Sequence, residues 1–181
     1  MGSGINGNLT TMKPIACSMH PEEALKLAIG EIRIILTTQI ESKRKILFHA
    51  CSYDTTEQET AGFKAIAQLG FSPEEIPTNS IIGWAKIAEI KTYDAAKFAI
   101  DGKLHGHGID LNQFLAAEGW QGQQVYGLVL EEHHYLNLPI MGVGSEWVHG
   151  DLWEAQSPFQ VVAFERALDA GSVDIAATVG Y

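Results

Sequence analysis

The chain has 181 residues, of which 46% are hydrophobic and 19% are charged, and its 12 basic and 22 acidic side chains give a formal charge of −10. This composition is typical of a folded domain with an apolar core and excludes a disordered chain. No apolar run reaches the roughly 18 to 20 residues of a membrane span, and the acidic balance disfavours non-specific binding to nucleic acid. We therefore expect a cytoplasmic protein without a membrane partner.

The first half of the chain predicts strands separated by two helices. His20-Pro21-Glu22-Glu23 opens the first helix, because proline suits the first helical position and acidic residues are favoured near a helix N-terminus. Gly30 ends it. Thr56 and Glu59 predict a capping box that opens the second helix. The predicted ranges are strands at 13–18, 32–38 and 45–51 and helices at 21–29 and 56–69.

The second half is less regular. A long apolar strand is predicted over 80–90, and Gly83 inside it indicates a bulge or the close approach of another backbone. Asp110 is expected to cap a helix that includes Phe114 and Leu115. The other predicted segments are a helix at 95–100, a loop at 102–108 and strands at 125–132 and 161–166.

The element order favours an α+β fold. Short helices interrupt the strands, and no βαβ unit repeats, so a doubly wound parallel sheet is not expected. We expect a curved sheet or β-barrel with short flanking helices. The predicted division is a flexible leader at 1–12, one domain at 13–168 with an insertion at 91–124, and a C-terminal tail at 169–181.

Several motifs follow one another between residues 13 and 168. They are Cys17-Ser18 with His20-Pro21, Ile46-Leu-Phe-His-Ala-Cys-Ser52, Pro77-Thr-Asn-Ser-Ile-Ile-Gly-Trp-Ala-Lys-Ile, Tyr126-Gly-Leu-Val-Leu-Glu, and Leu136-Asn-Leu-Pro-Ile-Met-Gly-Val-Gly followed by Trp147. In order and number, this set resembles the ASCH domain, a branch of the PUA-like β-barrel superfamily. The resemblance implies a PUA-like fold and a ligand cleft.

The usual ASCH signature after the first helix, of the form Gly-x-Lys-x-x-Glu-x-Arg, is not retained. Aligned on Gly30, this chain has Glu31 and Ile32 where lysines are usual, and Ile35 and Thr37 replace the glutamate and the arginine. In some members of the family, the lysine, a threonine and the glutamate serve amide hydrolysis. Without these residues that chemistry has no evident carrier, so the resemblance implies binding rather than catalysis.

The main hypothesis is therefore a binding domain for a small ligand, of nucleobase or nucleotide type, or for RNA. The cleft is expected between the first helix and the strand at 45–51. Its residues are expected to be Ser18, His20, Arg33 as a phosphate or carboxylate partner, Thr37, His49, Ser52, and Trp147 as a stacking platform. RNA is disfavoured by the net charge of −10. No cofactor is expected.

Two alternatives remain open. A hydrolase acting on an amide or nucleoside-like substrate would use Cys51 or His49, because alternation on a strand puts both on one face; an inert thiol beside a hydrogen-bonded histidine fits the same pattern. His105 and His107 are weak candidates for a metal pair. The favoured interpretation is a polar loop that carries these histidines, and no metal site is expected.

Overall fold

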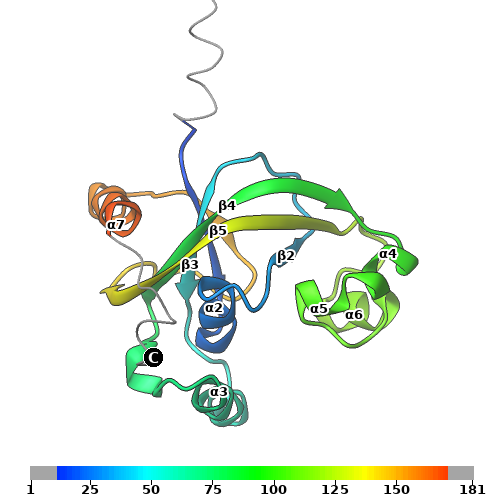
Figure 1. The fold of residues 1–181 in the computed structure, drawn as a ribbon, viewed down its shortest axis with the longest axis horizontal. Coiled ribbons are helices and arrows are strands. Elements are labelled where there is room, and N and C mark those ends of the chain that lie inside the picture. The colour runs from blue at the N-terminus through cyan, green and yellow to red at the C-terminus, as the bar shows by residue number, and fades with distance from the viewer. Residues whose placement is uncertain (1–11, 171–181) are drawn as a thin grey trace, which may run out of the picture.

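The computed structural model describes residues 12–170. The predicted leader, except Met12, and the tail beyond Ala170 lie outside these residues. Within them, six strands form one mixed sheet in the order β2-β5-β4-β3-β1-β6, and the sheet curls like half of a barrel (Figure 1). The strands are β1 (Ile15–Met19), β2 (Ile34–Thr37), β3 (Lys45–Ala50), β4 (Ser80–Thr92), β5 (Tyr126–Met141) and β6 (Leu152–Trp153). β1 and β3 are parallel, and the other neighbours are antiparallel.

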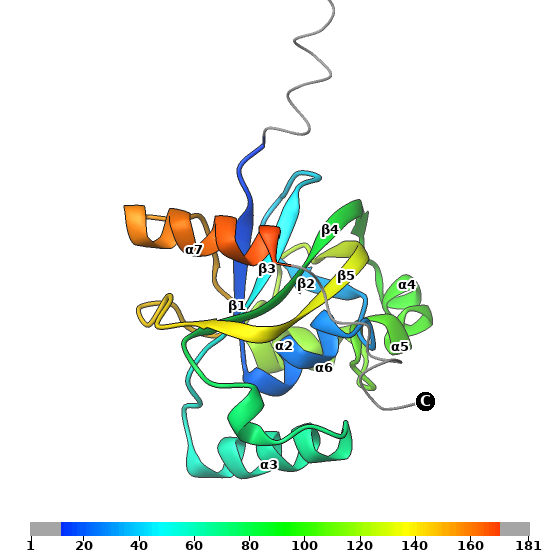
Figure 2. The ribbon, with the colours of Figure 1, turned by 60° about the vertical axis from the view of Figure 1, so that its left-hand side comes forward.

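The helices cover both faces of this sheet. They are α2 (Pro21–Ala28), α3 (Thr56–Gln68), α4 (Ala95–Ile100), α5 (Gly102–His105), α6 (Leu111–Glu118) and α7 (Pro158–Asp169), with a short 3-10 turn, η1 (Pro73–Glu75). α2 and α3 lie on one side of the sheet and α7 on the other (Figure 2). α4, α5 and α6 gather beside the β2 edge (Figure 1). This arrangement confirms the α+β fold with a curved sheet and short flanking helices that was expected from the sequence.

The first helix forms as its sequence predicts. Pro21 occupies its first turn, with Glu22 and Glu23 behind it, and Gly30 follows it with a φ of 79°, in the left-handed region that favours glycine. The side chains of Leu25 and Ala28, with other apolar residues of α2, are buried in the core beneath β3 and β4. Their burial holds the start of α2 at a fixed place beside the sheet.

The prediction for Gly83 is confirmed. A Cβ at this position would lie 2.2 Å from the backbone oxygen of His134 and 2.7 Å from the Cβ of Ala28. The register between β4 and β5 also shifts between Ile81 and Gly83. Glycine therefore allows α2 to pack directly onto the bend of the long β4–β5 ribbon.

Three predicted elements are wrong in detail. The capping box of α3 is formed by Thr55 and Gln58, one residue before the predicted pair. The 102–108 segment, predicted as a loop, contains the single turn of α5. The segment 161–166, predicted as a strand, lies inside α7, because Ser157 accepts a hydrogen bond from Gln160 as N-cap and Pro158 follows at the first helical position.

No helix of residues 12–170 is long and apolar enough to cross a membrane.

Candidate ligand-binding cavity

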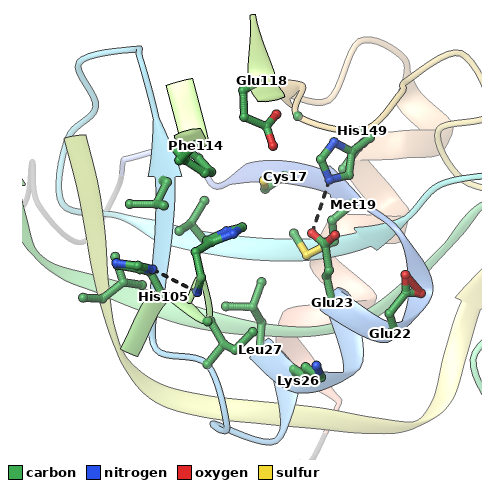
Figure 3. Close-up of a pocket in the computed structure, with 18 of the residues that line it drawn as sticks. Cys17, Met19, Glu22, Glu23, Lys26, Leu27, His105, Phe114, Glu118 and His149 are labelled. Carbon is green, nitrogen blue, oxygen red and sulfur yellow. Dashed lines mark hydrogen bonds and ion pairs between the residues drawn. The ribbon is translucent and has the colours of Figure 1, made fainter. Parts of the chain in front are cut away.

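A cavity of about 340 Å³ lies between α2, the strands β1 and β2, and the α5–α6 segment (Figure 3). Its floor is apolar and comes from β1, β2 and the inner face of α2. Its remaining lining combines carboxylates, imidazoles, one amine and two aromatic rings. These side chains are Glu22, Glu23, Glu118, His105, His107, His149, Lys26, Phe114 and Trp120.

Glu23 and His149 form an ion pair at the cavity. His149 Nε2 lies 3.3 Å from Glu23 Oε2. Burial alone would raise the pKa of Glu23, but the hydrogen bond from His149 and the nearby imidazoles lower it below its ordinary value. The same hydrogen bond raises the pKa of His149. The pair therefore favours an ionised carboxylate and a protonated imidazole in the absence of a ligand.

The two histidines of the α5 segment have different environments. His105 is buried and its Nε2 donates to the Phe98 carbonyl at 2.8 Å, while its Nδ1 accepts from the His107 backbone N–H at 3.2 Å. Both ring nitrogens of His105 are thus engaged, which leaves none for a metal ion. Burial lowers the pKa of His107, and the neighbouring His105 adds to this effect. His107 therefore presents a neutral imidazole to the cavity near pH 7.

Two of the predicted site residues, Ser18 and His49, belong to a buried network on the α7 side of the sheet. The Ser18 hydroxyl lies 2.7 Å from His49 Nδ1 and accepts from Trp153 Nε1 at 2.9 Å. His49 Nε2 donates to the Val143 carbonyl at 2.6 Å. Ser18 lines the cavity as part of β1, but its hydroxyl serves this network.

The other predicted residues are dispersed. Arg33 is exposed, and its Nε donates to the Gly30 carbonyl at 3.3 Å. The hydroxyl of Thr37 accepts from the Gln39 backbone at 3.1 Å, and Ser52 is exposed after β3. Trp147 stacks on Trp153 with ring centroids 5.1 Å apart. None of these four side chains lines the cavity.

His20 lies beside the cavity, next to His149, without being one of the residues that line it. It is the residue before α2, and its ring centroid lies 4.8 Å from that of His149. Of the predicted residues, His20 and Ser18 are thus the two that border the cavity region.

The position of the cavity differs from the expected cleft. α2 forms one wall, as expected, but the opposite wall comes from β2 and the α5–α6 segment instead of β3. Cys51 and His49, either of which the hydrolase alternative would use, share no hydrogen bond among residues 12–170, since His49 is fully engaged by Ser18 and Val143. Burial, aided by the charge of Glu23, raises the pKa of Cys51 to about 12, so its thiol stays protonated at neutral pH.

Several cavity residues have no site role in the sequence-based prediction. Glu22 and Glu23 were expected only to stabilise the start of α2, and the α6 residues only to form a helix. The His20-x-x-Glu23 spacing at a helix start is a usable signal, because residues three apart share a face. The contribution of His149, 126 positions after Glu23, has no comparable signal in the sequence.

The fold of this chain is similar to that of known ASCH structures. The crystal structure of ASCH from Zymomonas mobilis matches it with a TM-score of 0.55 at 15% sequence identity, covering 90% of this chain and 99% of that one. A mutant form of ZmASCH from the same organism matches with a TM-score of 0.53 at 14% identity, covering 85% and 97% of the two chains. No protein-family model and no curated protein sequence matches the chain. The likeness therefore concerns the fold.

Proposed function

On the ASCH-type, PUA-like fold that this chain shares with those structures, we propose that the cavity binds a nucleobase or nucleoside. The observation that carries this proposal is the pairing of aromatic and hydrogen-bonding side chains around one cavity of suitable size. Its volume of about 340 Å³ falls at the small end of the ~300–1,000 Å³ range of ligand sites. The half-buried Trp120 offers an apolar ring surface for a planar ligand, and the buried Phe114 packs against it with ring centroids 5.6 Å apart.

The charges of the cavity select among ligands of this type. Three carboxylates, Glu22, Glu23 and Glu118, line it, against the amine of Lys26 and the imidazolium of His149, so negative charge predominates. Carboxylates accept hydrogen bonds from the amino and imino groups of bases but repel phosphates. The proposal therefore favours free bases and nucleosides over nucleotides. RNA is a weaker candidate, because its phosphates would meet the same carboxylates on a chain of net charge −10.

Calorimetric titration tests this function. Adenosine, guanosine, cytidine and uridine are titrated into the full chain in a buffer that contains EDTA. The corresponding 5′-monophosphates are then titrated under the same conditions. We expect at least one nucleoside to bind, and to bind more tightly than its monophosphate. Tighter binding of the monophosphates, or no binding of any nucleoside, would contradict the proposal.

A pair of isosteric variants locates the site. Glu118 lines the cavity and makes no ion pair among the described residues. Removing its charge in Glu118→Gln should weaken nucleoside binding about tenfold, because a hydrogen bond to a charged group contributes about 1.5–3 kcal/mol. The matched control is Glu57→Gln in the exposed first turn of α3, which should leave the affinity unchanged. An equal loss in both variants would place the ligand elsewhere.

A further inference from the structure

Three side chains able to ligate a metal ion meet at the rim of the cavity. His20, Glu23 and His149 each offer one ligand atom, and these atoms all lie within 4.8 Å of one another. We propose that they form a binding site for a divalent transition metal ion, of which Zn²⁺ fits best, with an open coordination position toward the cavity. This proposal does not rest on the nucleoside site, because it concerns the metal alone.

The distances suit zinc coordination. Glu23 Oε2 and His149 Nε2 are 3.3 Å apart. With metal–ligand bonds of ~2.0–2.1 Å, two ligands of a tetrahedral zinc ion lie about 3.4 Å apart. This pair thus already has the separation that a shared ion requires. The ligand atom of His20 lies within 4.8 Å of the other two. A small rotation of the His20 side chain would bring it to the distance that coordination requires.

His20 has a nitrogen without another role. Its Nε2 is buried and has no hydrogen-bond partner in the described part of the chain. A buried polar atom without a partner is costly, and coordination of a metal ion would satisfy it. His20 precedes α2 and Glu23 lies three residues later in its first turn, so one helix start positions two of the three ligands.

The third ligand sits in an anchored loop. His149 lies between β5 and β6, and the next residue, Gly150, donates its N–H to the Ser18 carbonyl at 2.8 Å. The Val148 N–H donates to Asp151 Oδ2 at 2.9 Å. These contacts hold the loop beside β1, which is the kind of support that orients metal ligands.

The ligand set indicates the class of ion. Two imidazoles and one carboxylate suit Zn²⁺ with three protein ligands and one open position, whereas Ca²⁺ and Mg²⁺ prefer oxygen ligands. Glu23, His149 and the neighbouring Glu22 also line the cavity. The nearby acidic groups favour a cation at this end of it (Figure 3).

Zinc titration of the chelator-treated full chain tests the site. Calorimetry with zinc chloride at pH 7.5 should show one ion bound per chain. His149→Ala and His20→Ala should each lower the zinc affinity roughly 100-fold or more. Even the loss of a residue that only hydrogen-bonds to a metal ligand lowers metal affinity by about 10–100-fold. His134→Ala is the matched control: His134 lies in β5 and stacks on Trp84 of β4, so this variant should leave zinc binding unchanged. Circular dichroism confirms that the variants are folded.

Cobalt substitution gives a second readout. Co²⁺ bound by the wild-type chain should show the visible absorption of a tetrahedral site, and His149→Ala should lose it. Failure of the folded wild type to bind zinc would overturn the proposal. So would an affinity that His149→Ala leaves unchanged, or one that His134→Ala lowers equally. Nucleoside titrations in EDTA remain independent of either result.

Discussion

His49 is the fully buried centre of a hydrogen-bond chain between the sheet and α7. Because the Val143 carbonyl can only accept, His49 Nε2 must carry the proton, and its Nδ1 then accepts from the Ser18 hydroxyl. The Ser18 oxygen in turn accepts from Trp153 Nε1. The direction of every bond is thus determined, and each polar atom of the chain has a partner. The backbone of Gly144 packs directly against this network, since a Cβ at this position would lie 2.8 Å from His49 Nε2.

The neutral state of His49 predicts a pH-dependent stability. Burial lowers its pKa below the ordinary value of 6.5, although the hydrogen bond to Val143 and the charge of Glu146 oppose the shift. Below about pH 6.5 the unfolded chain therefore binds a proton at His49 that the folded chain does not. The contribution of His49 to the free energy of unfolding should fall as the pH drops through this range, by up to about 1.4 kcal/mol per pH unit until the folded pKa is reached.

Urea unfolding of the wild type and His49→Gln between pH 7.5 and 5 isolates this effect. Glutamine retains a donor for Val143 but does not titrate. The stability difference between wild type and variant should shrink as the pH falls, while other titrating pairs such as Glu23 and His149 cancel in the comparison. A difference that stays constant or grows toward low pH would contradict a buried neutral His49.

The helices show what local sequence determines. Asp110 caps α6 as predicted, with Gln113 completing the box. The prediction for α3 chose the wrong threonine, because Thr55 and Thr56 each have a suitable partner three residues on, Gln58 and Glu59. The structure selects Thr55, whose side chain accepts from the Gln58 N–H at 3.1 Å.

The two threonines make a matched pair for a stability measurement. Thr55→Ala removes the N-cap and should lower the free energy of unfolding by about 1 kcal/mol. Thr56→Ala changes the first residue of the helix proper, where alanine is a good helix former, and should have almost no effect. Chemical denaturation of both variants checks this order. Equal effects, or the reverse order, would assign the cap to Thr56.

α7 illustrates the limit of local strand propensity. Val161-Val162-Ala163-Phe164 is rich in residues that favour strands, and this predicted a strand. The helical signal was also present, in Ser157-Pro158 and in the spacing of the buried Ala163, Phe164 and Ala167. Tertiary burial of this face against Trp153 and its neighbours decided the outcome.

At the scale of the molecule, the fold was predictable from the sequence and the cavity was not. The apolar runs and turns of the chain are local signals and predicted the strands of an α+β fold, and the resemblance of the ordered motifs to the ASCH family implied the curved sheet. The cavity requires α2, β2, the α5–α6 segment and the loop around His149 at once. Which face of the α5–α6 segment meets α2 is set by long-range packing, for which no local pattern in the chain provides a signal.

The central claim, a nucleobase or nucleoside site in this cavity, is tested most directly by the tryptophan indole signals. The chain has four tryptophans, and of Trp84, Trp120, Trp147 and Trp153 only Trp120 lines the cavity. The measurement is a ¹H–¹⁵N spectrum of the indole N–H groups during titration with the tightest nucleoside. Our account predicts that the Trp120 signal shifts with saturation and the other three stay in place. A shift of Trp147 with Trp120 unchanged would contradict it and place the ligand on the opposite side of the sheet.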